Sequence, residues 1–305
     1  MMLSLKKWVI LVIILSAFVS FLLYPGMLKE DVPDTDNGDA TPPIFNVTDS
    51  IQVAAFNIQI FGRSKRSKEE VMDVLSRIVR EFDVVLVQEI RDASGETAPE
   101  FLEIINQREG NAYAYIESPR LGRTISKESY AYFYNTRRVN YSFSFVYNDT
   151  SDVFEREPYI ATFMSGNFDF TLVGIHTKPD DAYNEIGNLT LVVSSLLNGE
   201  RDIIVLGDLN ADGRYFDEED TTNPLKAEEY YWVISNDMDT MTRTDWTYDR
   251  IILLNSTYGH EYVSSGVFHF DKAYNITDEE FVWDVSDHFP VYAEFNTVLS
   301  DDDPS

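Results

Sequence analysis

The chain has 305 residues, of which 52 are acidic and 24 basic, and its formal net charge is −28. It contains no cysteine, which excludes a disulfide framework, a thiolate zinc site and a cysteine nucleophile. Proteins that bind polyanions tightly usually have a basic surface, so this charge argues against tight, nonspecific nucleic-acid binding at low salt. Any chemistry must therefore use carboxylate, imidazole, amide or hydroxyl groups, or a hard metal ion.

The chain begins with a basic segment and an apolar run. Residues 1–7 contain Lys6 and Lys7, and residues 8–24 form a mostly apolar run near the lower length limit for spanning a bilayer. The lysines favour a cytoplasmic N-terminus, and no convincing small-residue cleavage site follows the run. We expect a transmembrane signal anchor, with a cleaved signal peptide as the alternative. In either case the remainder lies outside the cytoplasm, membrane-anchored or secreted.

An acidic linker and an acidic tail flank the expected globular part. Residues 25–50 are rich in Asp, Pro, Gly and Thr, a composition typical of a disordered linker. We expect a catalytic domain over residues 51–297 and a tail over residues 298–305. Without the charges of the flanking segments the domain keeps 43 acidic and 21 basic residues, a net charge near −22. Sequons that agree with export occur at Asn46, Asn140, Asn148, Asn188, Asn255 and Asn275.

Short apolar runs alternate with helical patterns along the domain. Amphipathic helices are predicted over residues 67–82 and 182–197, and residues 130–147 predict a hairpin of two aromatic, alternating strands. No internal repeat and no Gly-rich phosphate loop is found. Further strands are predicted over residues 51–58, 83–90, 159–164, 169–177, 202–211, 248–254 and 290–295. This order predicts an α/β fold with mixed sheets.

Polar residues recur at the C-terminal ends of the predicted apolar strands. Any one of them could be only a cap or a turn residue. In layered α/β folds, however, strand ends are where functional sites are assembled, because the sheet holds the side chains rigidly. The residues at these positions are Asn57, Glu89, His176, Asp208 and Asn210. Their common placement favours a functional site.

The sequence stretches that contain these residues resemble the deoxyribonuclease I family. The stretches "VAAFNIQIFG", "DVVLVQEIRD", "LGRTISKESYAYFY", "FEREP", "VGIHTKP", "VLGDLNAD", "TYDRIIL" and "VSDHFPV" have its order and approximate spacing over about residues 51–296. The wider endonuclease/exonuclease/phosphatase superfamily shares "QE", "GDLN" and "SDH", whereas "QEIRD", "LGR", "KE" and "EREP" resemble the deoxyribonuclease I branch. The resemblance implies a four-layer α/β sandwich of two packed mixed β-sheets flanked by helices.

The resemblance also implies metal-assisted hydrolysis of DNA phosphodiester bonds, with no covalent enzyme intermediate. Asn57, Glu89, Asp208 and Asp287 would hold Mg²⁺ or Mn²⁺, ions that prefer a few carboxylate and amide oxygens and keep several waters. Ca²⁺ is a further candidate, although Trp246 departs from the cysteine often found near the family's calcium-stabilised loops.

The catalytic set implied by the resemblance contains two imidazole–carboxylate pairs. A carboxylate fixes the tautomer of its histidine and raises the basicity of the ring, which prepares it to activate water or to donate a proton. Which histidine is the base and which is the acid stays open. The pairs are His176 with Glu128 and His288 with Asp249, and the set is completed by Asp208 and by Asn210, which would donate to the phosphoryl oxygen.

The expected substrate-binding residues depart further from the family pattern than the expected catalytic residues do. Arg91 and Arg156 match positions that contact DNA and phosphate, although either could be a surface ion pair instead. Gln59 stands where the family has an arginine, and Ser126 where it has a stacking tyrosine. Both changes remove DNA contacts without changing the catalytic set.

Three functions are therefore compared. The first is a membrane-tethered or secreted deoxyribonuclease with low sequence preference. The second is a phosphatase or phosphodiesterase of the same superfamily that acts on a small phosphorylated molecule or a phospholipid headgroup, which the acidic charge and the missing contacts favour. The third is an inactive surface binding module, against which both complete pairs argue. DNA is the expected partner, the membrane is expected to bind the N-terminal segment, and no obligate protein partner is inferred.

Overall fold

The computed structural model describes residues 49–197 and 201–300. The predicted membrane anchor, the linker as far as residue 48 and the last five tail residues lie outside these ranges. Within them, no helix combines the length and the apolar character that crossing a membrane requires.

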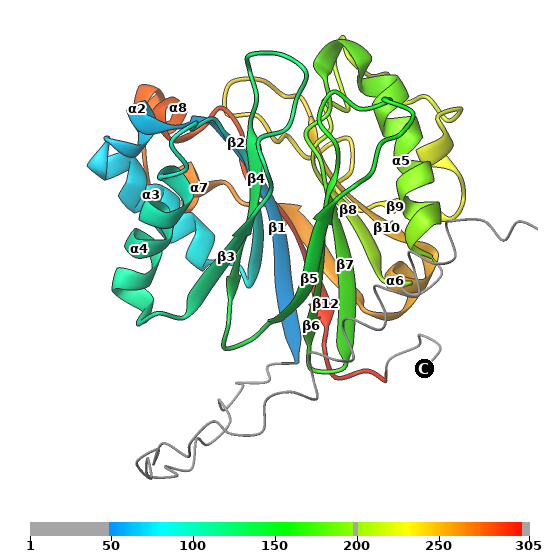
Figure 1. Ribbon diagram of the computed structural model, residues 1–305, viewed down its shortest axis with the longest axis horizontal. Coiled ribbons are helices and arrows are strands. Elements are labelled where there is room, and N and C mark those ends of the chain that lie inside the picture. Colours follow the sequence, from blue (N-terminus) through cyan, green and yellow to red (C-terminus); the bar gives the residue numbers. More distant parts are fainter. Residues whose placement is uncertain (1–48, 198–200, 301–305) are drawn as a thin grey trace, which may run out of the picture. The chain divides into compact units, whose positions relative to one another are not determined.

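Two six-stranded sheets form the centre of the described part of the chain (Figure 1). The first sheet has the order β11-β12-β1-β2-β4-β3 and consists of β1 (Ser50–Phe61), β2 (Val84–Ile90), β3 (Tyr113–Glu117), β4 (Ser129–Asn135), β11 (Tyr262–Val267) and β12 (Val291–Asn296). The second has the order β5-β6-β7-β8-β10-β9 and consists of β5 (Asn140–Val146), β6 (Tyr159–Ser165), β7 (Phe168–Gly174), β8 (Ile203–Asp208), β9 (Tyr230–Trp232) and β10 (Asp249–Leu254). Both sheets are mixed, because β1 runs parallel to β2 and β7 runs parallel to β8.

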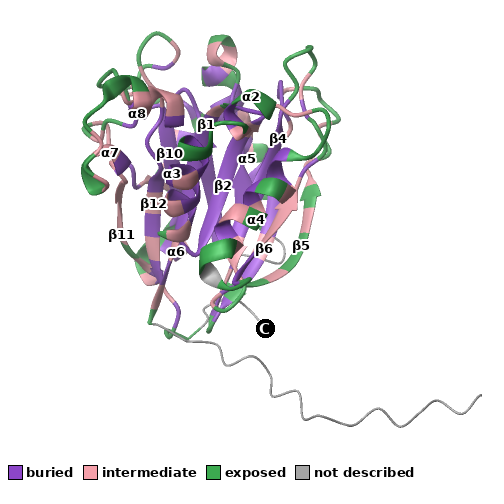
Figure 2. Cartoon of the chain, turned by 90° about the vertical axis from the view of Figure 1, so that its left-hand side faces the viewer, coloured by how far each residue is buried: buried purple, intermediate pink, exposed green. Residues whose placement is uncertain are grey.

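The central strands are buried on both faces. Val53 and Leu86 lie in the core between the sheets, whereas Ala54 and Val85 lie in the core beneath the helices of the first sheet. Successive side chains of a strand point to opposite faces, so a strand covered on both sides is apolar at almost every position. The continuous runs that predicted β1 and β2 have this origin, and Figure 2 shows both strands buried.

Helices cover the outer face of each sheet and complete four layers (Figure 1). The helices packed on the first sheet are α2 (Arg63–Arg66), α3 (Glu69–Arg80), α4 (Thr97–Glu109), α7 (Phe270–Ala273) and α8 (Glu279–Val285). On the second sheet, α5 (Ala182–Leu196) packs Ile186 and Leu189 against Val173 and Val205, and α6 (Asn255–His260) follows β10. The predicted four-layer α/β sandwich is confirmed.

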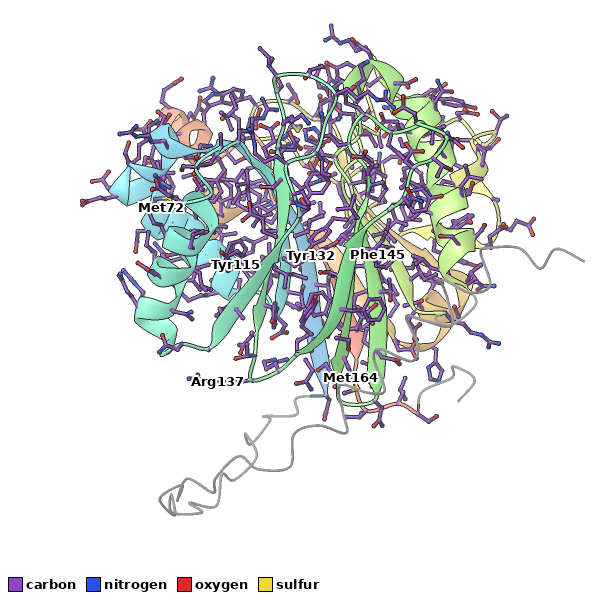
Figure 3. All side chains as sticks on the ribbon, viewed as in Figure 1. Met72, Tyr115, Tyr132, Arg137, Phe145 and Met164 are labelled. Atoms are coloured by element: carbon purple, nitrogen blue, oxygen red, sulfur yellow. The ribbon has the colours of Figure 1, made fainter. Side chains whose placement is uncertain are left out.

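The predicted hairpin over residues 130–147 is wrong. Its two halves are β4 and β5, which belong to different sheets. β4 pairs with β2 on one edge and with β3 on the other, so neither edge is free for β5, which pairs with β6 instead. The alternation of aromatic residues arises because the inward side chains of β4 enter the core between the sheets. Tyr132 is one of them, and its hydroxyl donates to the Tyr159 carbonyl of the second sheet over 2.9 Å (Figure 3).

A glycine in β7 allows the two sheets to approach closely. A Cβ atom added at Gly174 would lie 2.5 Å from the Tyr132 hydroxyl oxygen and 2.9 Å from a Leu86 methyl group. Overpacking of this kind costs typically about 1–3 kcal/mol. We therefore expect Gly174→Ala to lower the free energy of unfolding by that amount in urea denaturation.

The matched control is Gly259→Ala in α6. A Cβ atom at Gly259 would meet no atom within 4 Å, and alanine is the better helix former. The control should therefore lose no stability, and equal losses in the two variants would contradict the close packing at Gly174.

Candidate active site

Adjacent strand ends bring the predicted residues together. In the first sheet Asn57 of β1 lies opposite Gln88 of β2, and in the second sheet Asp208 of β8 lies opposite Asp249 of β10. His176 follows β7, which runs parallel to β8. One end of each sheet therefore contributes side chains to the same place, because the two sheets pack face to face.

The side chain of Gln88 joins the two sheets at this point. It is completely buried, and its Nε2 donates to the Ile175 carbonyl over 2.7 Å. Its Oε1 accepts from the backbone N–H of Asp208 over 2.9 Å. One amide from the first sheet therefore fixes the residue before His176 and the backbone of Asp208 in the second sheet.

Both predicted histidine–carboxylate contacts occur in the structure. Nδ1 of His176 lies 2.8 Å from Oε1 of Glu128, and Nδ1 of His288 lies 2.7 Å from Oδ2 of Asp249. All four side chains are at least nine-tenths buried. The contact at Nδ1 leaves Nε2 of each ring facing the interior of the site.

The two Nε2 atoms converge on one carboxylate oxygen. Oδ2 of Asp208 lies 3.3 Å from Nε2 of His176 and 3.6 Å from Nε2 of His288. The amide of Asn57 donates to the same oxygen over 3.0 Å, which is a second direct contact between the sheets. Asp208 is therefore the centre of the arrangement.

Two of the site residues have a strained backbone conformation, which sets the direction of their side chains. Glu89 has a φ of 60° and Asn210 a φ of 49°, a left-handed conformation that non-glycine residues seldom adopt. The Oε2 of Glu89 accepts from the Ile60 N–H over 2.7 Å, within the bulge that ends β1. Asn210 donates its backbone N–H to Asp208 over 3.0 Å and its side-chain amide to the Thr177 carbonyl over 3.1 Å. Backbone strain of this kind is concentrated at functional sites.

The charged surroundings favour a protonated His288. Burial alone would lower its pKa, but the carboxylates of Asp249, Asp208 and Asp287 outweigh burial and raise the pKa to about 10. Burial raises the pKa of Asp249, against the opposing effect of His288. A proton is therefore held firmly between these two side chains in the metal-free protein.

In the pair of His176 and Glu128, burial and nearby charges also shift the pKa values in opposite directions, and two arginines add to the charges. Burial would lower the pKa of His176, but Glu128 and Asp208 raise it. Burial would raise the pKa of Glu128, but His176, Arg156 and Arg91 lower it. Glu128 is therefore an ionised, completely buried carboxylate that is matched by nearby cations.

The donor atoms fit a hard divalent cation. Metal-ligating atoms come within 4.8 Å of one another in two groups among the described residues, which are Glu89, Glu128 and His176, and Asp208, Asp249 and His288. The predicted ligands Glu89 and Asp208 fall in different groups. Asp287 is in neither. Its Oδ1 is buried, has no hydrogen-bond partner and lies 3.8 Å from Nε2 of His288, and a buried anionic oxygen without a hydrogen bond is a position where a cation is favourable. Carboxylate and amide oxygens of this kind suit Mg²⁺ or Mn²⁺.

The two predicted substrate arginines contact carboxylates of the candidate site. Arg91 places Nη2 at 3.1 Å from Glu89 and 3.5 Å from Glu128. Arg156 is 8% exposed, and its Nε lies 3.2 Å from the His176 carbonyl oxygen and 3.3 Å from Oε1 of Glu128. Both guanidinium groups therefore stabilise the Glu128 side of the site, and Arg156 has little surface left for a ligand.

Two buried polar groups position the segment that carries Asp287 and His288. The Ser286 hydroxyl donates to the Asn57 carbonyl over 2.6 Å and accepts from the His288 N–H over 3.1 Å. Lys65 of α2 donates to the Ile58 and Val285 carbonyls, each over 2.9 Å. Both groups tie this segment to the end of β1, next to Asn57.

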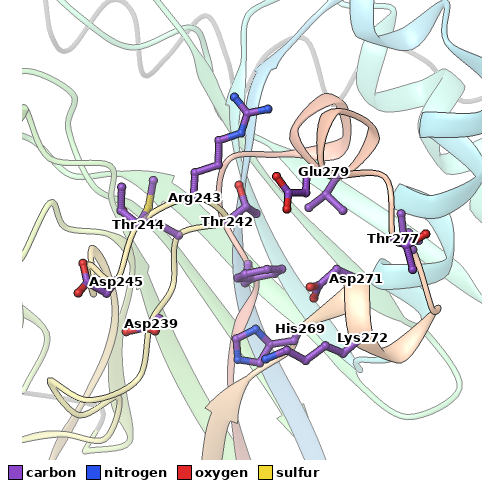
Figure 4. Close-up of a pocket in the computed structure, with 14 residues that line it drawn as sticks. Asp239, Thr242, Arg243, Thr244, Asp245, His269, Asp271, Lys272, Thr277 and Glu279 are labelled. Atoms are coloured by element: carbon purple, nitrogen blue, oxygen red, sulfur yellow. The ribbon is translucent and has the colours of Figure 1, made fainter.

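A cavity of about 830 Å³, whose lining side chains are drawn in Figure 4, is lined by none of the predicted catalytic residues. Met241, which pairs with His288 across an isolated bridge, lines one wall, and Phe289 lines another. The remaining wall carries acidic and basic side chains in a mixture, among them Asp271, Lys272 and His269. This mixture indicates no single class of ligand, so the chemistry is assigned from the paired histidines.

The sequence patterns missed Gln88 and Lys65. A glutamine inside a strand of valines and leucines is a detectable signal, because such a polar group needs a buried partner. Lys65 gave no signal, since a lysine between a predicted strand and a predicted helix is ordinary. The two histidines that match no motif lie apart from the pairs: His260 ends α6, and the ring of His269 packs 4.7 Å from that of Phe289.

Sequence comparisons place the chain among known hydrolases. The model of the Endonuclease/Exonuclease/phosphatase family matches residues 54–288. The chain is 35% identical to deoxyribonuclease gamma of Homo sapiens over 263 residues, covering 79% of this chain and 85% of the relative. It is 33% identical to deoxyribonuclease-1 of Bos taurus over 260 residues, covering 79% of this chain and 91% of the relative.

Solved structures show the same fold at low sequence identity. A D. rerio TDP2 structure complexed with a single-strand DNA product superposes with a TM-score of 0.56 and 15% identity, covering 82% of this chain and 100% of that chain. A mannosyl-6-phosphatase of Bacteroides thetaiotaomicron superposes with a TM-score of 0.57 and 16% identity, covering 80% and 99%. The fold thus occurs in proteins with different substrates, and the site has to supply the functional argument.

The raised pKa of His288 predicts a pH dependence of stability. Because the folded pKa, about 10, exceeds the unfolded value near 6.5, the stabilisation is fully present below about pH 6.5 and is lost as the pH rises towards 10. In EDTA, the unfolding free energy of the unaltered protein should exceed that of His288→Gln by a larger margin at pH 6 than at pH 9.5. Urea denaturation across this range measures the margin.

His269 provides the control because its pKa is lowered, first by burial and then by Lys272. The difference between the unaltered protein and His269→Gln should stay constant between pH 7.5 and pH 9.5. A margin for His288→Gln that does not change with pH would show that His288 is neutral in the folded protein.

Proposed function

Because the chain belongs to the endonuclease/exonuclease/phosphatase family, in its deoxyribonuclease I branch, we propose that it is a metal-dependent endonuclease acting on DNA. The proposed reaction is hydrolysis of internal phosphodiester bonds with low sequence preference. The deoxyribonucleases among its relatives, at about a third identity over most of the chain, support this substrate.

One observation carries the proposal: two buried histidine–carboxylate pairs direct both Nε2 atoms at Asp208. Hydrolysis of a phosphodiester needs one group that takes a proton from water and one that gives a proton to the leaving oxygen. Two imidazoles that face the same centre supply both groups. Their carboxylate partners hold the rings in one orientation, so little reorganisation is needed during the reaction.

Other residues would bind and orient the phosphate. Asn210 uses one amide N–H for the Thr177 carbonyl, and its second N–H is available to a phosphoryl oxygen. Glu89, Asn57, Asp208 and Asp287 would hold Mg²⁺ or Mn²⁺. When bound, such an ion lowers the pKa of water and stabilises negative charge on phosphoryl oxygens.

The proposed location is outside the cytoplasm. The support comes from the apolar run over residues 8–24 and from Lys6 and Lys7, all outside the described residues. The six sequons are compatible with membrane anchoring or secretion.

A second candidate is hydrolysis of a small phosphorylated molecule. The observation that favours it is the engagement of Arg91 and Arg156 by catalytic carboxylates, which leaves fewer cations for a DNA backbone. The domain charge near −22 also opposes binding of a long polyanion. An inactive binding module is less well supported, because such a module has no need for two complete buried pairs.

Supercoiled plasmid DNA distinguishes these functions. The full chain with Mg²⁺ should convert plasmid first to relaxed circles and then to linear molecules, and excess EDTA should stop the conversion. Agarose gels over time provide the measurement. An inert plasmid, together with hydrolysis of a small phosphodiester by the same preparation, would replace the proposal with the second candidate.

Each histidine should be needed for turnover. His176→Ala and His288→Ala should each reduce kcat by about 10²–10⁴, because positioned proton-transfer groups contribute rate factors of that size. The double variant should lose much less than the product of the two single losses, since the groups act as a unit. His269→Ala is the matched control and should keep full activity. Losses below tenfold in both single variants would contradict the assignment.

A further inference from the structure

The backbone N–H of His176 has its hydrogen-bond partner in the opposite sheet. β7 pairs with β6 only as far as Gly174, so His176 lies beyond the last paired residue on that side. The N–H groups of its neighbours, Ile175 and Thr177, donate to carbonyl oxygens of β8. Because successive N–H groups of an extended chain point in opposite directions, that of His176 points away from β8. It donates over 3.0 Å to the hydroxyl oxygen of Tyr130, a residue of β4 in the first sheet.

Tyr130 is placed to act on the protein rather than on a substrate. Its side chain is completely buried in the core between the two sheets. Burial raises the pKa of its phenol, which therefore keeps its proton at neutral pH. The same hydroxyl lies 3.5 Å from the His176 carbonyl oxygen, which also accepts from Nε of Arg156 over 3.2 Å. Tyr130 therefore contacts both backbone polar groups of His176 and does not reach solvent.

Tyr130 and Glu128 hold His176 from the same side of one chain segment. Glu128 forms an isolated antiparallel bridge with Leu121 directly before β4, so the chain is extended from there to Tyr130. Side chains two residues apart on an extended chain point to the same side. Glu128 contacts Nδ1 of the imidazole over 2.8 Å, and Tyr130 binds the backbone N–H of the same residue. These two contacts, one on the ring and one on the main chain, restrict where Nε2 can lie.

We propose that Tyr130 is a positioning residue for catalysis, whose hydroxyl fixes the backbone of His176 so that Nε2 stays directed at Asp208 and the reacting phosphate. This inference rests on the proposed function and adds a residue that never touches the substrate. Without the hydroxyl, the His176 N–H would be buried without the hydrogen bond that it now makes. The backbone would then move, and a displacement of about 1 Å at a reacting group can cost about 10²-fold in rate.

Removal of one oxygen atom from the full chain tests this role. Tyr130→Phe should reduce kcat on supercoiled plasmid with Mg²⁺ by about 10-fold to 100-fold, because the imidazole of His176 loses its position. KM should stay the same, since Tyr130 is too deeply buried to bind a substrate. Initial rates of nicking at several plasmid concentrations give both constants.

The matched control is Tyr132→Phe. Tyr132 is the next inward residue of β4, is also completely buried, and donates its hydroxyl to the Tyr159 carbonyl of the second sheet over 2.9 Å. Each variant therefore loses one buried hydrogen bond between the sheets. The two variants should shift the midpoint of urea denaturation by similar amounts, whereas only Tyr130→Phe should lose kcat.

Two further measurements separate positioning from a general loss of packing. The chain has only four histidines, so the imidazole signals of His176 can be assigned in NMR spectra by their loss in His176→Ala. In the metal-free protein these signals should shift in Tyr130→Phe and stay in place in Tyr132→Phe. In addition, Tyr130→Phe should cause no further loss of kcat when residue 176 is already alanine, since there is then no ring to position.

The outcomes distinguish this inference from the proposed function. If plasmid is nicked but Tyr130→Phe keeps full kcat or leaves the His176 signals unchanged, the positioning role is wrong and the nuclease proposal stands. Equal losses of kcat in the two tyrosine variants, or a loss by Tyr130→Phe that persists beside His176→Ala, would also overturn the inference. So would a failure of Tyr130→Phe alone to fold, which would make Tyr130 a residue of the fold.

A different substrate would still allow the comparison. If only a small phosphodiester is hydrolysed, the second candidate replaces the proposed function, and a loss of kcat confined to Tyr130→Phe on that substrate supports the positioning role. If the unaltered protein hydrolyses neither substrate, the proposed function fails and the inference fails with it.

Discussion

The contact between the Gln88 side chain and the backbone of the second sheet joins the two sheets where the residues of the candidate site meet. Gln88 comes from the first sheet and bonds to Ile175 and Asp208 of the second. Glu89 follows it directly, and His176 follows Ile175. A strand can hold its own side chains rigidly, but contacts between the sheets set the distances between site residues that come from different sheets. The added Cβ at Gly207 would lie 2.7 Å from Nε2 of Gln88, so the glycine leaves room for this contact.

The second constraint is electrostatic. A domain with a charge near −22 buries several carboxylates at one point, and each needs a compensating donor. Glu128 has His176 and two arginines, Asp249 has His288, and Asp208 has both histidines and Asn57. These carboxylates therefore raise the pKa of both histidines when no cation is present. A divalent cation held near Asp208 would add positive charge beside both imidazoles and would lower their pKa values, which would prepare one of them to act as a base.

The sequence predicted the residues of the site better than it predicted which strands pair with each other. Side chains at the ends of apolar runs were found because burial on both faces produces an unmistakable pattern, as at β1, β2 and β8. The hairpin over residues 130–147 was predicted wrongly, since alternation shows that a strand has an inner face but not which strand lies beside it. Gln88 and Lys65 were missed because their partners are backbone carbonyls and N–H groups, which carry no mark in the sequence.

The same distinction explains why the expected substrate contacts depart further from the family pattern than the expected catalytic residues do. The catalytic residues stand at strand ends or are tied to them by buried contacts, so changing one disturbs both sheets. Gln59 and Ser126 lie in the bulge of β1 and in a loop, where a substitution removes a substrate contact at little cost to the fold. Loop positions can therefore change while the paired histidines keep their buried carboxylate partners.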